Sequence, residues 1–402
     1  MIAKHFPRFA LMGAGLVFVA NSSRAELKCI GADAATGTSA AVVVDDVPLV
    51  HTAQILGLDS AGQLAGKGDA ASQARQIFGN LEAVLKVNAS DLDKVVKLNV
   101  CLASKEALLS VQRVLASTFH GTRKPAVTFV TSGLANEQAL VAMDAVAVAA
   151  PETVREKWPR VPAIYATPGM RTAALLPSGP KIYISGMADT NGLPEATRKT
   201  LEKLIATLAQ MGLQKTDIVQ LKAFVEPASE LAVVRKEIID FFRSAAPPLV
   251  FVEWISPRPN PPIEIELIAA AYGDFTKETD SVSFLTPPGT TSTKVFSRVA
   301  RVNHGKLVFI SGLYGMKSQD AGGQVREMFD SLKQVLKPAG SDFEHLVKAT
   351  YYVSESDTSD KLNDIRTELY NPQRPPAASK ARVKNMAVPG KTVMMDMIAV
   401  TR

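Results

Sequence analysis

The stretch IYISGM, residues 182–187, returns 126 residues later as VFISGL, residues 308–313. A short basic turn precedes each copy, GPK in the first case and HGK in the second. A long amphipathic segment follows each copy. Self-similarity at a fixed period is the sequence signature of tandem repeats. The two stretches therefore indicate that the fold is built from a repeated unit of about 126 residues.

The order of expected elements reveals a third, upstream copy of the unit. We divide the chain into a first block (38–150), a second block (163–273) and a third block (290–402). Each block is predicted to open with a hairpin-like pair of strands. The first block carries HTAQ, residues 51–54, where the other two carry Ile-Ser-Gly. The same elements then follow in each block, and we treat the three blocks as candidate domains.

A first helix is predicted in each block from apolar residues at i, i+3, i+4 and i+7 spacing, around residues 74–85, 201–208 and 325–336. A buried strand follows, at 95–102, 218–225 and 346–353. A second helix ends in an aromatic residue. Its aromatic residue always lies 23 positions after a valine of the buried strand, as in the pairs Val96 and Phe119, Val219 and Phe242, and Val347 and Tyr370.

Two further strands close each block. A proline-bounded strand is predicted at 124–130, 247–254 and 375–383, and a last apolar strand at 139–148, 263–271 and 392–400. The order ββ-α-β-α-ββ predicts an α+β fold with helices on one face of a mixed sheet. The other sheet face is largely apolar and needs a partner. We therefore expect the three sheets to close on one another as an intramolecular pseudo-trimer, and the chain to be a monomer.

The N-terminus is typical of an export signal. Basic residues precede an apolar core of about a dozen residues, too short for a comfortable membrane span. Cleavage after Ala25 is expected, with a retained anchor as the alternative. We therefore predict a signal peptide over 1–25, a periplasmic or secreted location, and no membrane attachment after cleavage.

The net charge bears on whether the chain binds nucleic acid, and the two cysteines bear on whether it contains a disulfide. The formal net charge is +6, but three of the 45 basic residues lie in the first 25 positions, so 42 then face 39 acidic residues. This near balance, without a basic run interleaved with aromatics, argues against a nucleic-acid partner. Cys101 lies in an apolar run and is expected to be a buried thiol, with a bridge to Cys29 as the alternative.

The repeat resembles the Rid family, the reactive-intermediate deaminases also called YjgF-type proteins. The run GQLAGKGDAASQARQIFGNLEAVLKVNASDLDKVVKLNVCL carries this resemblance in the first block, and the ISG motif and closing strand carry it in the others. The resemblance covers roughly residues 38–400. It implies a chorismate-mutase-like fold, homotrimers with ligand clefts between subunits, and hydrolysis of imino or enamine acids without metal or cofactor. We accordingly predict no metal and no cofactor.

The chain departs from the family at the positions that carry this chemistry. The resemblance implies an arginine that grips the substrate carboxylate, a bidentate contact that suits a planar guanidinium. The three blocks have Val127, Leu249 and Ala378 there. The glutamate expected on the last strand is retained as Glu264 in the second block, whereas the corresponding residues are Ala142 and Met394.

The candidate site residues follow from the same comparison. Glu264 is the candidate catalytic residue, with a polar sheet edge as the alternative. Ser185 and Ser311 are interpreted as cleft-lining hydroxyls or strand packing, because no elbow or base for a nucleophile surrounds them. Arg235 is the best replacement cation, unless it is a solvated helix residue. The complete set of predicted ligand-binding residues is Thr52, Ser185, Gly186, Arg235, Ser311, Gly312 and Asn363.

Two functions remain open from the sequence. The first is an exported protein that binds a small molecule in clefts between blocks and is not a 2-imino acid deaminase of the usual kind. The second is a deaminase or related hydrolase of imines or enamines, active in one cleft through Glu264.

Overall fold

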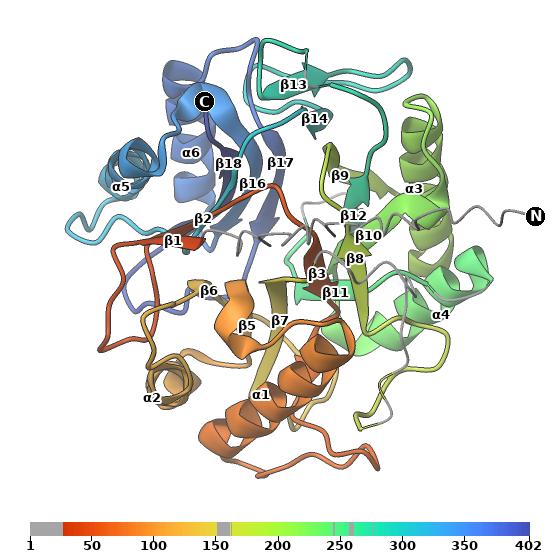
Figure 1. The fold of residues 1–402 in the computed structure, drawn as a ribbon, viewed down its shortest axis with the longest axis vertical. Coiled ribbons are helices and arrows are strands. Elements are labelled where there is room, and N and C mark those ends of the chain that lie inside the picture. The colour runs from red at the N-terminus through yellow and green to blue at the C-terminus, as the bar shows by residue number, and fades with distance from the viewer. Residues whose placement is uncertain (1–26, 151–160, 162, 244–245, 257–260, 276) are drawn as a thin grey trace, which may run out of the picture.

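The computed structural model describes residues 27–402 except 151–160, 162, 244–245, 257–260 and 276. The predicted signal peptide lies outside this part of the chain. Three mixed sheets surround a common centre, and a pair of helices covers the outer face of each (Figure 1). The expected α+β class is confirmed.

Each sheet is covered by two helices from one block. Asp69 caps the first helix of block one by accepting from the Ala71 backbone, and Asp320 does the same for block three through Gly323. Such caps satisfy backbone donors that the first turn leaves free. The six helices are α1 (Ala70–Val87), α2 (Leu108–Thr118), α3 (Leu193–Ala209), α4 (Leu231–Phe242), α5 (Ala321–Ala339) and α6 (Ser356–Leu369).

The strands after the first helices match the sequence prediction. Each buried strand pairs in parallel with the proline-bounded strand and antiparallel with the closing strand. In block one these strands are β5 (Val95–Leu102), β6 (Ala126–Thr131) and β7 (Val141–Val148); in block two β10 (Ile218–Val225), β11 (Leu249–Glu253) and β12 (Ile263–Ala270); in block three β16 (Leu346–Val353), β17 (Ala377–Arg382) and β18 (Val393–Val400).

The two opening strands of each block do not form the expected hairpin with each other. The second strand stays in its own sheet: β3 (Leu49–Thr52) with the short β4 (Ile55–Leu56), β9 (Lys181–Asp189) and β15 (Leu307–Ile310). The first strand joins a different sheet. Thus β2 (Ala41–Val44) pairs with β15, β8 (Ala173–Leu176) with β3, and β14 (Val299–Val302) with β9. Two edge strands, β1 (Leu27–Ile30) and β13 (Val282–Leu285), extend two of the sheets.

This exchange has a simple physical reason. The first strand makes the same antiparallel ladder whether its partner belongs to its own block or to another block, so exchange costs no hydrogen bonds. It also buries both faces of the strand, since all four residues of β2 are buried. Each sheet is therefore completed by a strand of another block.

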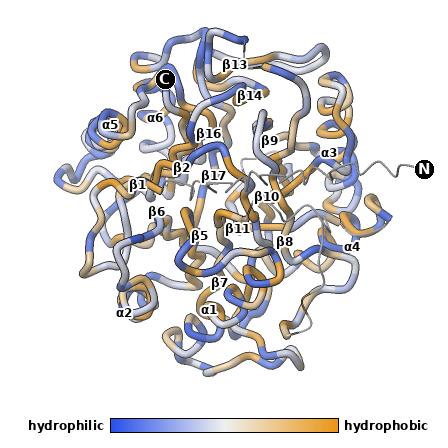
Figure 2. Tube along the Cα trace, in the orientation of Figure 1, coloured by the Kyte–Doolittle hydropathy of each residue, from blue (hydrophilic) through white to orange (hydrophobic). Residues whose placement is uncertain are grey.

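Apolar side chains lie on both faces of each sheet. Three clusters lie between a sheet and its own helices. Two more clusters join residues of all three blocks, one around Tyr183 and Phe309 and the other around Phe224 and Tyr352. The hydrophobic stretches therefore gather toward the middle of the molecule (Figure 2). The inner sheet faces pack against one another, as their apolar character predicts.

Both cysteines are free thiols, and Cys101 is buried as the sequence predicts. Cys29 instead contacts the Lys124 carbonyl oxygen. Within the described residues, no helix combines the length and apolarity that a membrane crossing requires.

Candidate functional site: the junctions between blocks

The Ile-Ser-Gly motifs lie where one block meets the next. The Ser185 hydroxyl, on β9, donates to the Ser297 carbonyl at 2.6 Å and accepts from the Ala378 backbone N–H at 2.7 Å. Ser311, after β15, repeats this pattern with the Ser39 carbonyl and the Val127 N–H. Both hydroxyl protons go to carbonyl oxygens rather than to a general base. Each serine therefore links two blocks through hydrogen bonds, Ser185 at Ala378 and Ser311 at Val127.

Gly186 makes room for the Glu264 side chain. The two residues lie on adjacent strands, where Glu264 of β12 pairs with Ala188 of β9. A Cβ atom at position 186 would collide with the Glu264 carboxylate. At Gly312 a Cβ would lie 3.2 Å from the Met394 Sδ atom, a tight but adjustable contact. The glycine is therefore a strict requirement only where the glutamate is present.

The Glu264 carboxylate lies among polar groups from two blocks. Burial raises the pKa of Glu264 to about 7, against a hydrogen bond from Ser379 and the positive charge of Arg298. Arg298 donates to the Gly186 carbonyl at 2.8 Å, and Ser379 accepts from the Gly186 N–H at 3.2 Å. A carboxylate that titrates near neutral pH can accept a proton from water, which is the role of a general base.

The junction of blocks one and two differs from the other two. Thr52 stands in the serine position but is fully buried, and its hydroxyl accepts from Ala145 of its own block at 2.9 Å. Gln54 instead spans this junction: its backbone N–H donates to Leu249 and its side chain to the Phe251 carbonyl, each at 3.0 Å. The hydroxyl of Thr52 therefore does not point into this junction.

A pocket opens at this junction, with a volume of about 680 Å³ including its mouth. Arg235 of α4 and Leu249 of β11 line it from block two, and Arg171 and Tyr165 line it from the segment before β8. Burial lowers the pKa of both guanidinium groups, that of Arg171 to about 10, so both are charged at neutral pH. Among the described residues, no carboxylate forms an ion pair with Arg235. The pocket is thus lined by two guanidinium groups.

Asn363 of α6 contacts β17, the strand that carries Ser379, and no contact joins it to Arg235 among the described residues. Its side-chain oxygen accepts from Lys380 at 3.0 Å and from Arg366 at 2.8 Å. Lys380 is two residues beyond Ala378 on β17, and burial lowers its pKa. The predicted site residues therefore divide among three junctions instead of forming one site.

The sequence analysis missed several residues of these junctions. Arg171, Tyr165 and Gln54 come from segments whose pattern carries no cleft signal. Arg298 and Ser379 reach Glu264 from another block, and only the strand exchange brings Arg298 there. Among the described residues, no three His, Cys, Asp or Glu side chains are grouped as a metal ion would require.

The comparisons with known proteins concern one family. The model of the family described as Endoribonuclease L-PSP matches residues 32–149 and 290–401, more than half of the chain. Protein DfrA of Myxococcus xanthus is 31% identical over 114 residues, which is 26% of this chain and 85% of that protein.

Solved structures described as Rid-family or YjgF-family proteins are also similar to this chain. A Rid-family protein, YyfB of Yersinia pestis, is 25% identical with a TM-score of 0.27, and covers 28% of this chain and 87% of its own. A YjgF-family protein of Neisseria meningitidis is 22% identical with a TM-score of 0.23, and covers 30% and 95%. The matched length of Protein DfrA, 114 residues, is about that of one block.

Proposed function

Because the chain belongs to the Rid (YjgF, Endoribonuclease L-PSP) family, we propose that it is an exported small-molecule-binding member built as an intramolecular pseudo-trimer. Three Rid-like units in one chain replace three subunits, and the junctions between blocks replace the clefts between subunits. The exchanged strands and the shared inner clusters support this arrangement. The proposed location is the periplasm or the medium, and the proposed assembly is a monomer.

The proposed ligand is a small carboxylate held in the pocket between blocks one and two. The observation that carries this proposal is Arg235, a half-buried guanidinium in that pocket without a carboxylate partner among the described residues. A planar guanidinium matches a carboxylate through two parallel hydrogen bonds. Leu249 lines the same pocket at the family arginine position, so Arg235 and Arg171 would take over from the replaced residue.

The test is calorimetric titration with pyruvate, and with neutral pyruvamide as the matched probe. Pyruvate is expected to bind and pyruvamide to bind at least tenfold more weakly, since the charge-assisted bonds contribute about 1.5–3 kcal/mol. Arg235→Ala should abolish the difference. Arg243→Ala is the control, because this exposed residue at the end of the same helix removes an equal charge outside the pocket. Equal binding of both probes, or an equal loss in both variants, contradicts the proposal.

A second function is favoured by the surroundings of Glu264. Its pKa of about 7, raised by burial, suits a general base that activates water against an imine carbon. Ala378, in place of arginine at this junction, would suit a substrate without a carboxylate. The proposed reaction is metal-independent hydrolysis of an imine or enamine.

This second function is tested by generating imines in situ with an amino-acid oxidase or an amine oxidase and following their decay. Acceleration that Glu264→Gln removes supports the hydrolase. If the mature protein accelerates neither kind of imine, the hydrolase proposal is wrong. If acceleration survives in Glu264→Gln, the reaction occurs but this site assignment is wrong.

A further inference from the structure

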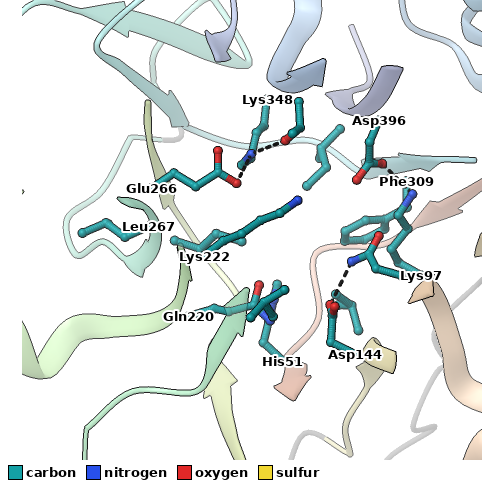
Figure 3. A pocket seen from close by; sticks show the side chains of 16 residues that line it. His51, Lys97, Asp144, Gln220, Lys222, Glu266, Leu267, Phe309, Lys348 and Asp396 are labelled. Atoms are coloured by element: carbon teal, nitrogen blue, oxygen red, sulfur yellow. Dashed lines mark hydrogen bonds and ion pairs between the residues drawn. The ribbon is translucent and has the colours of Figure 1, made fainter. Parts of the chain in front are cut away.

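A chamber of charged side chains lies at the centre of the molecule, between the two apolar clusters that all three blocks share (Figure 3). The sheets supply it with three cations and three carboxylates at or near matching positions. Buried charges are costly unless each has a partner. The six side chains are Lys97, Lys222, Lys348, Asp144, Glu266 and Asp396.

Two pairs join neighbouring blocks in the same way. Lys97 of β5 lies 2.6 Å from Asp396 of β18, and Lys348 of β16 lies 2.6 Å from Glu266 of β12. Each lysine follows the aligned valine of its buried strand by one residue. Each carboxylate occupies the same place on its closing strand, as the ladder partners show. Two of the three equivalent places are thus filled by a lysine ammonium group that faces the carboxylate of another block.

The third equivalent place lacks its ammonium group. Gln220 occupies the lysine position on β10, and its amide donates to the Thr52 carbonyl at 2.8 Å. The matching carboxylate, Asp144, is only 1% exposed. One of its oxygens accepts from the Asn99 amide at 2.8 Å, and the other oxygen, Oδ1, has no hydrogen-bond partner in the described structure.

The neighbouring side chains leave this place open. His51 is 1% exposed, and its ring lies beside the Gln220 side chain, whose polar contact works against the effect of burial on the pKa of His51. Neither ring nitrogen makes a hydrogen bond of normal geometry among the described residues. The third lysine, Lys222, is bonded to the Tyr352 hydroxyl at 2.7 Å. In Figure 3 the side chain of Lys222 passes above His51 and Gln220, and its Nζ atom is directed away from both residues.

We propose that this place binds a monovalent cation the size of ammonium or potassium, in contact with Asp144 Oδ1, the Asn99 amide oxygen and a His51 ring nitrogen. The ion would take the position that a lysine ammonium group fills in the two equivalent pairs. A neutral imidazole and an amide oxygen are acceptors, as such an ion requires. The Asn99 oxygen also has no partner among the described residues.

The other charges of the chamber set the conditions for binding. Lys222 faces the same space and repels a second cation, so we expect millimolar rather than micromolar affinity. Burial raises the pKa of Asp144 to about 6, against the Asn99 hydrogen bond and the positive charges of Lys222 and Lys97 and with the negative charge of Asp396. Burial lowers the pKa of His51 to about 4, together with the positive charge of Lys181. Above pH 7 the carboxylate is therefore ionised and the imidazole neutral, and binding should weaken as the pH falls through 6.

The test is the melting temperature at pH 8 in potassium, ammonium or tetramethylammonium chloride at equal ionic strength. Potassium and ammonium should raise it saturably, by about 2 °C at ten times the dissociation constant. Tetramethylammonium, which is too large, should not. Asp144→Asn, a change of similar size, should remove the rise. Gln220→Lys should remove it too, because the variant supplies its own ammonium group. The exposed Asp240→Asn should retain it.

Crystals soaked in rubidium chloride give a second readout of the same site. A single anomalous peak in contact with Asp144 is expected for the natural chain and no peak there for Gln220→Lys. An equal rise in tetramethylammonium, a rise that persists in Asp144→Asn, or rubidium bound only elsewhere overturns the proposal. If Gln220→Lys fails to fold, Asp144→Asn and the rubidium peak still decide it.

Discussion

At the scale of single residues, Glu264 is the candidate catalytic residue that distinguishes one block from the other two. Its sister positions hold Ala142 and Met394, so one junction alone keeps a carboxylate there. The Glu264 side chain requires a glycine at position 186, whereas a Cβ at position 312 would meet the Met394 sulfur and Thr128 at 3.2–3.4 Å. The serine before each glycine, Ser185 or Ser311, forms hydrogen bonds that link two blocks. In the Ile-Ser-Gly motif, the serine therefore has a structural role. The glycine at position 186 is needed because the Glu264 side chain occupies the space beside it.

The raised pKa of Glu264 makes stability depend on pH in a defined window. The folded state holds this proton more tightly than the unfolded state, whose pKa is near 4.5. The contribution of Glu264 to stability is therefore lost as the pH rises from about 4.5 to about 7. In urea unfolding, the free energy of unfolding of Glu264→Gln should increase relative to that of the natural chain between pH 5 and pH 8.

The control for this pH dependence is Asp240→Asn, an exposed change on α4, which should run parallel to the natural chain at both pH values. A constant difference between Glu264→Gln and the natural chain would show that Glu264 is not buried as described. If Glu264 is also the general base, imine decay should accelerate as the pH rises through about 7.

At the scale of elements, two hydrogen bonds join β9 to β17: the Ala378 N–H donates to the Ser185 hydroxyl at 2.7 Å and the Gly186 N–H to the Ser379 hydroxyl at 3.2 Å. Ser185→Ala leaves the Ala378 N–H without its acceptor, which should cost about 1–3 kcal/mol of unfolding free energy. Ser117→Ala is the control, because this hydroxyl only bonds within α2, and its loss should cost less than about 0.5 kcal/mol. Denaturant melts compare the two. Equal costs would show that the junction bond is not important.

The elements also show how far sequence reasoning reaches. The strand 95–102 was predictable to the residue because its apolar run is bounded on both sides. The exchange of β2, β8 and β14 was not, since a strand's pattern fixes which face is buried but not which block supplies the partner. Lys97 and Lys348, charged residues inside buried runs, carried a signal for the central chamber that the family comparison did not use.

At the scale of the whole molecule, the proposed pseudo-trimer would make one chain equivalent to three subunits. The exchanged strands tie each sheet to another block, and the inner clusters contain residues from all three. Such an arrangement should unfold as one unit, since no block keeps a complete sheet of its own.

Small-angle scattering of the purified protein, with its mass measured on the same sample, is the decisive test of the proposed pseudo-trimer. A compact ring of one chain predicts the mass of a monomer and a radius of gyration of about 21 Å. Three independent blocks on linkers would give a clearly larger radius at the same mass, and assembly through other surfaces would give a multiple of the mass. Either of these results would contradict the account.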